Sequence, residues 1–144
     1  MTAPGHAALR QLALTVLARR AGPAAGAKAI AAAADRAYDD LVRVLATYIG
    51  GMGVKALTDR ALHLAKSEYS SLVPTRMAED PEDTFAQFID ALKRQDPAVA
   101  SEGAAAVFAT LLGLLATFIG EPLAARLVRQ AWPDALSGAN TEGT

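Results

Sequence analysis

Asp59 and His63 are the pair of side chains whose types and spacing come nearest to acid–base chemistry. Residues four apart lie on the same face of a helix, and a carboxylate beside an imidazole can orient a general base. No serine, threonine or second histidine stands in a nucleophile position next to them. We therefore interpret the pair as solvated surface groups, and we predict no catalytic residue and no enzyme activity.

A run of acidic residues precedes a predicted helix and is the best candidate for cation binding: Glu79, Asp80, Glu82 and Asp83. A calcium loop needs a central glycine and a later glutamate, which this run lacks. Acidic side chains also favour the first turn of a helix, where they offset the helix dipole. With no cysteine and only two histidines in the chain, we predict no metal site and no cofactor.

A glycine-rich break, Gly50-Gly51-Met52-Gly53, is followed by Lys55 and could hold an anion at a helix N-terminus. It matches neither phosphate-loop pattern, so we interpret it as a tight turn. The helices around this break have the spacing of a helix-turn-helix, but they carry no basic reading face. The net charge of the chain is −1. We predict no binding to nucleic acid.

The composition of the 144 residues predicts that helices position all of these groups. Hydrophobic residues make up 52%, aromatic residues 6%, and alanine roughly a quarter of the chain. Alanine has the highest helix propensity, and no segment alternates apolar and polar residues as a half-buried strand does. We expect an all-α fold with one domain over residues 1–136 and a flexible tail over 137–144.

Apolar periodicity, glycines and prolines divide the chain into six predicted helices. They span about 6–20, 24–49, 54–72, 81–95, 98–119 and 122–132.

An internal repeat is the strongest pattern in the sequence. The segment Leu41–Gly50 aligns with Leu111–Gly120, and both contain Leu-Ala-Thr, an aromatic residue and Ile-Gly. The breaks between helices align as well as the helices do. We interpret the fold as a six-helix bundle formed by tandem duplication of a three-helix unit, with one copy over 6–72 and the other over 81–132.

The segment 103–120 carries no charge over eighteen residues, which is the minimum for a membrane-spanning helix. Its repeat partner contains five charged side chains, and the segment 103–120 lacks the flanking basic cluster that is typical of a membrane span. We therefore expect a buried helix and no membrane span. A helix that is apolar all round needs cover on every side, either from its own chain or from a second copy.

The two halves differ in charge, with +4 over residues 1–72 and −5 over 73–144. We interpret this asymmetry first as attraction between the two halves within one bundle. The alternative is association, in which the basic half of one chain meets the acidic half of a second copy or another acidic partner. We expect a non-enzymatic regulatory or adaptor protein, dimeric, in a bacterial cytoplasm because cysteine and a secretory signal are both missing. The candidate partner-binding residues are Arg60, His63, Arg126 and Arg129.

The alternative is a sensor or carrier of an apolar small ligand held between the two halves. A cavity of several hundred Å³ would favour it. Aromatic residues at matching positions are the candidates to line such a cavity: Tyr38, Tyr48, Phe108 and Phe118.

Overall fold

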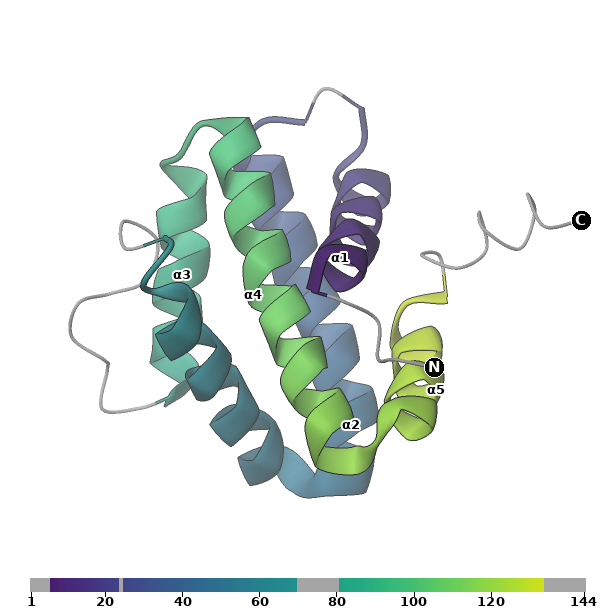
Figure 1. Ribbon diagram of the computed structural model, residues 1–144. Coiled ribbons are helices and arrows are strands. Elements are labelled where there is room, and N and C mark those ends of the chain that lie inside the picture. Colours follow the sequence, from purple (N-terminus) through teal and green to yellow (C-terminus); the bar gives the residue numbers. More distant parts are fainter. Residues whose placement is uncertain (1–5, 24, 70–80, 134–144) are drawn as a thin grey trace, which may run out of the picture.

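The computed structural model describes residues 6–23, 25–69 and 81–133. This part of the chain contains five α-helices and no strand (Figure 1), so the all-helical prediction is confirmed. The helices are α1 (His6–Ala21), α2 (Ala27–Ala65), α3 (Pro81–Lys93), α4 (Pro97–Ile119) and α5 (Glu121–Ala131).

The predicted separation of residues 24–49 from 54–72 into two helices is not confirmed, because α2 runs through both. Its backbone leaves the helical region only at Gly50, with φ 79° and ψ 159°. Positive φ is easily adopted by glycine, which has no Cβ, so one residue is enough to redirect the chain. Beyond Gly50 the helix returns alongside the rest of the bundle (Figure 1). We call 27–49 and 51–65 the first and second limbs of α2.

The second limb ends at Ala65, earlier than the predicted residue 72. Ser67 Oγ donates to the Leu64 carbonyl over 3.1 Å, and a serine that bonds its own backbone in this way competes with helix continuation. Residues 70–72 lie outside the described part of the chain. The same is true of Glu79, Asp80 and the predicted tail 137–144, and of the side chains of Glu82 and Asp83.

The ends of α4 follow from local chemistry. Asp96 caps its start, accepting from Ala98 N over 3.1 Å, as aspartate often does at this position. Pro97 occupies the first turn, where its missing N–H costs nothing. Gly120, with φ 93° and ψ 150°, ends the helix. The helix α5 then begins directly at Glu121.

The centre of the fold is α4, which packs against all four other helices. Helix α1 packs chiefly against α4, and α3 chiefly against α2. Residues Gly103–Ala109 of α4 are buried without interruption. By length and composition alone, both α2 and α4 could cross a membrane. In the most apolar 18-residue stretch of each helix, 56% is buried inside the protein in α4 and 22% in α2.

Candidate functional site

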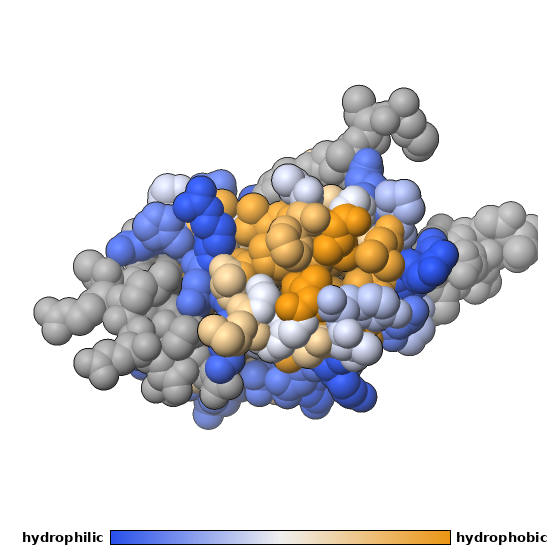
Figure 2. Space-filling view, turned by 90° about the horizontal axis from the view of Figure 1, so that it is seen from below, coloured by the Kyte–Doolittle hydropathy of each residue, from blue (hydrophilic) through white to orange (hydrophobic). Residues whose placement is uncertain are grey.

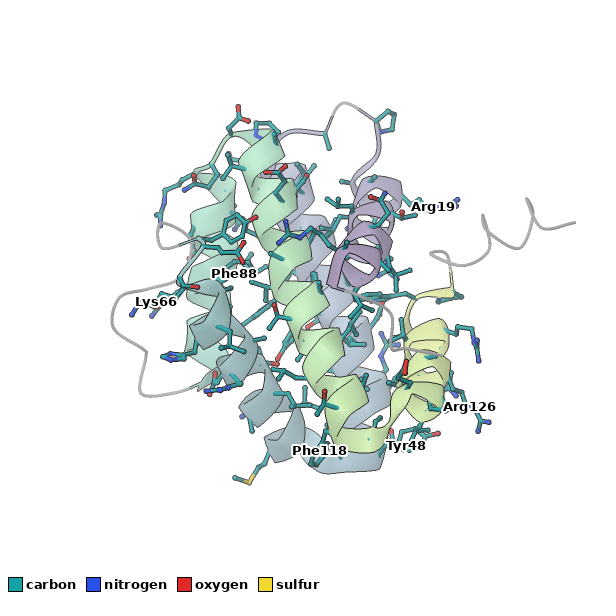
Figure 3. All side chains as sticks on the ribbon, viewed as in Figure 1. Arg19, Tyr48, Lys66, Phe88, Phe118 and Arg126 are labelled. Carbon is teal, nitrogen blue, oxygen red and sulfur yellow. The ribbon has the colours of Figure 1, made fainter. Side chains whose placement is uncertain are left out.

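The four aromatic residues expected to line a ligand cavity lie in three different environments. Phe108 is buried in the core, where its ring packs edge-on against Trp132 with centroids 5.4 Å apart. Tyr48 and Phe118 point outward at one end of the molecule (Figure 3) and are 51% and 65% exposed. Tyr38 alone of the four lines one of the cavities described below.

The structure does not bring together the four residues predicted to bind a partner. Arg60 and His63 are exposed on the second limb of α2, whereas Arg126 and Arg129 are exposed on α5. These two elements lie on opposite sides of α4 (Figure 1). Of the pair Asp59 and His63, His63 is exposed, whereas Asp59 is partly buried and lines a cavity of which His63 is not part.

An apolar groove of about 690 Å³ lies between α1, α4 and α5. Eleven of its fifteen lining residues are alanine, glycine, leucine or valine. The four polar ones are Thr110, Thr117, Glu121 and Arg129. Each threonine hydroxyl donates to a backbone carbonyl one turn earlier in α4, that of Ala106 and that of Gly113. The lining is therefore apolar, with one positive and one negative side chain.

The groove leaves part of the most apolar helix uncovered. Gly113, Leu114 and Ala116 are only partly buried and Thr117 is exposed, all on α4. The gap lies between α5 and the N-terminal half of α1. Helix α5 contributes Ala124, Ala125 and Val128 to it.

A second cavity, of about 390 Å³, lies between the two limbs of α2 and α3. We call it the acidic cavity, because its titratable groups are three carboxylates, one ammonium and one phenol. These are Asp35, Asp39, Asp59, Lys55 and Tyr38. Counting the carboxylates and the ammonium as ionised, its lining has a charge of −2.

Tyr38 is fixed in the acidic cavity by contacts on two sides. Its ring stacks on Phe85 of α3, with centroids 3.9 Å apart and planes 21° apart. Its hydroxyl lies 2.8 Å from Thr58 Oγ1, and Thr58 donates its own proton to the Val54 carbonyl over 2.9 Å. Since a threonine has one hydroxyl proton, Tyr38 is the donor to Thr58. Burial raises the pKa of the Tyr38 hydroxyl, which stays protonated.

The surroundings of two carboxylates in the acidic cavity, Asp39 and Asp59, disfavour their ionised forms. Partial loss of hydration raises the pKa of Asp39, although the residue is largely exposed, and the neighbouring charges of Asp35 and Asp40 raise it further. Burial also raises the pKa of Asp59, against an opposing effect of Lys55. Asp59 Oδ1 is buried and has no hydrogen-bond partner within the described residues.

The acidic cavity and the apolar groove occupy corresponding positions in the sequence, 70 residues apart. Seven residues of one have their counterpart in the other: 39 and 109, 42 and 112, 51 and 121, 54 and 124, 55 and 125, 58 and 128, 59 and 129. The chemistry differs at five of these pairs. Gly51 corresponds to Glu121. The other four residues of the acidic cavity and their counterparts in the groove are Asp39 and Ala109, Lys55 and Ala125, Thr58 and Val128, and Asp59 and Arg129.

Sequence reasoning did not find the acidic cavity. The spacing of Asp59 and His63 directed attention to one helix face, whereas the cavity that Asp59 lines also includes Tyr38 and Phe85, which are more than 20 positions away. The alignment at an offset of 70 residues held a signal, because three polar residues that line the acidic cavity align with apolar residues that line the groove. The aligned residues are Asp39 and Ala109, Lys55 and Ala125, and Thr58 and Val128.

Apolar side chains also gather at the end of the molecule where α2 bends and α4 stops. We define this apolar end by Tyr48, Met52 and Phe118, of which Met52 is 86% exposed. Figure 2 looks onto this end and shows hydrophobic residues at its centre with hydrophilic residues around them. The bends that create it, at Gly50 and Gly120, have nearly the same backbone angles.

Comparison with protein-family models, with curated proteins and with solved structures gives no match.

Proposed function

We propose that the protein is a non-enzymatic binding protein whose apolar groove takes up a small, largely apolar and uncharged molecule. The observation that carries the proposal is the uncovered face of α4 at the floor of a 690 Å³ groove. A groove of this volume is within the range of small-molecule sites, which are mostly apolar with a few polar groups.

The position of the groove agrees with a ligand held between two halves of the molecule. One wall comes from α1, in the N-terminal half, and the floor and other wall come from α4 and α5. Glu121 and Arg129 offset each other in charge, which favours an uncharged ligand over an ion. A ligand in this place would touch both halves and could report on their packing, as a sensor requires.

We also propose that the two halves derive from a duplicated three-helix unit. Three features support it: the bends at Gly50 and Gly120, the corresponding cavities, and the packing of α1 on α4 and of α3 on α2. The last feature is an exchange, in which the first helix of each half covers the long helix of the other half. Neither half would then close its core alone.

Titration with the neutral fluorophore N-phenyl-1-naphthylamine tests the groove. Its emission should rise on binding to the purified protein, because the groove is apolar. Ala125→Phe adds a ring to the groove wall and should weaken binding about five- to tenfold. The matched control is Ala56→Phe, at an exposed alanine of α2 outside both the groove and the acidic cavity, which should bind as the wild type does. Equal loss in both variants, or no binding by the wild type, would refute the proposal.

A second candidate function, self-association as a dimer, is favoured by the apolar end. Its exposed tyrosine, methionine and phenylalanine are types enriched at the cores of protein interfaces. Tyr48 and Phe118 are also counterparts in the repeat, so the surface is made of two similar parts, as suits a two-fold contact with an identical surface.

Sedimentation velocity of the wild type and of Phe118→Asp tests the dimer. The charged variant should sediment as a monomer at concentrations where the wild type is dimeric. The control is Val99→Asp, which alters an exposed apolar residue near the opposite end of α4 and should leave the dimer intact. A wild type that is monomeric at all concentrations would exclude this role.

A further inference from the structure

The acidic cavity plays no part in the function proposed above, and its chemistry is opposite to that of the apolar groove. We propose that it binds a small organic cation, an alkylammonium or diammonium compound.

The fold does not require the polar side chains of Asp39 and Thr58. The positions equivalent to Asp39 and Thr58 hold Ala109 and Val128 in the apolar groove. Val128 is buried as Thr58 is. A side chain of the same shape without a hydroxyl group therefore packs at the position equivalent to Thr58. At these two positions the polar side chains of the acidic cavity are thus additions, because an apolar side chain fills the equivalent place in the groove.

The lining of the acidic cavity has an unused hydrogen-bond acceptor. Asp59 Oδ1 is removed from water and accepts no hydrogen bond from the described residues. A buried, unsatisfied carboxylate oxygen costs free energy, and a donor with a positive charge would remove that cost. The lining contains three carboxylates and one ammonium group, that of Lys55. A bound cation would therefore bring the charge of the site closer to zero.

The lining of the acidic cavity suits an organic cation better than a metal ion. Nowhere in the described residues do three His, Cys, Asp or Glu side chains converge closely enough to hold a metal ion. The cavity instead combines carboxylates with the rings of Tyr38 and Phe85. Aromatic rings attract organic ammonium groups. The volume of 390 Å³ is room for a compact ligand and not only for a bare ion.

The test is calorimetric titration of the full chain with 1,4-diaminobutane in an amine-free buffer at low salt. The wild type should bind it, whereas Asp59→Asn should bind about tenfold more weakly and Asp39→Asn should also lose affinity. The matched control is Asp90→Asn, which removes one carboxylate from an exposed site on α3, where Asp90 pairs with Lys93 at 3.5 Å. It should bind as the wild type does. The neutral analogue 1,4-butanediol should not bind.

Amide chemical shifts locate the ligand independently of any variant. 1,4-Diaminobutane should shift the signals of Thr58 and Phe85, and it should not displace N-phenyl-1-naphthylamine, because the two sites are separate. Failure of the fluorophore to bind would therefore leave this proposal intact. It is overturned if the wild type shows no heat of binding up to about 10 mM diamine, if the diol binds as tightly, or if Asp90→Asn loses as much affinity as Asp59→Asn.

Discussion

The indole Nε1 of Trp132 donates a hydrogen bond to the main-chain carbonyl of Ala37 over 2.9 Å, joining positions 95 residues apart. Trp132 is fully buried and follows the last residue of α5, while Ala37 is in the middle of the first limb of α2. The contact ties the C-terminal helix to the N-terminal half of the core. Because a buried indole N–H needs a partner, the bond also fixes the orientation of the ring against Phe108.

Replacing Trp132 with phenylalanine should therefore destabilise the protein by about 1–3 kcal/mol, through the lost hydrogen bond and the smaller ring. Urea unfolding followed by circular dichroism measures the change. Tyr48→Phe, which removes a polar group from an exposed ring, should change the free energy of unfolding by less than about 0.5 kcal/mol. Similar effects of the two substitutions would contradict the anchoring role of Trp132.

Alanine at Gly50 or at Gly120 should destabilise the protein by similar amounts, about 1–2 kcal/mol each. Both residues have φ between 79° and 93°, where a Cβ is strained. A Cβ at Gly50 would meet no atom within 4 Å, and at Gly120 it would meet only Pro122 Cδ at 4.0 Å. The cost is thus set by the backbone, and thermal unfolding of the two variants should give nearly equal shifts. A variant as stable as the wild type would show that the bend does not need positive φ.

Gly113→Ala should stabilise the protein by about 0.5–1 kcal/mol, since glycine lowers the stability of a helix interior. A Cβ there would lie 3.8 Å from Leu9 Cδ1, an ordinary contact. Gly53→Ala is the comparison, because its Cβ would lie 3.3 Å from two atoms of Ile49 and the gain should be smaller or reversed. Chemical denaturation of both variants measures the difference, which would be zero if packing at these glycines were irrelevant.

The stability of the protein should depend on pH through Asp39. Partial loss of hydration and the charges of Asp35 and Asp40 raise the pKa of Asp39 in the folded state, so the folded protein holds this proton more tightly than the unfolded chain does. The resulting stabilisation is fully present below the unfolded pKa of about 3.9 and is lost as pH rises through the folded pKa.

Asp39→Asn removes this dependence. At pH 7 and low salt the variant should be more stable than the wild type, by about 0.5 kcal/mol or less because the side chain is exposed and screened. At pH 4 the advantage should shrink. Melting temperatures at the two pH values give the comparison, with Asp90→Asn as control. An advantage that is the same at both pH values would show that ionisation of Asp39 is not its source.

The amino-acid sequence by itself determines the helical elements of this protein and most of their ends. Alanine content and apolar spacing specify helices, Asp96 with Pro97 specifies the start of α4, and the residues Ile-Gly at 49–50 and 119–120 specify where the long helices turn. These features depend on neighbours within one or two turns, so they can be read from the residues themselves. The offset of 70 residues also relates the positions that line the two cavities.

Only the tertiary structure decided which of these positions line the two cavities. Whether the chain separates into two helices at Gly50 or bends within one depends on how the second limb packs, which no local pattern states. The acidic cavity needs Phe85 from α3 beside Tyr38 and Asp59 from α2, and the apolar groove needs α1 to cover α4 incompletely. Burial, and with it the raised pKa of Asp59 and its unsatisfied oxygen, arises from contacts between residues distant in sequence.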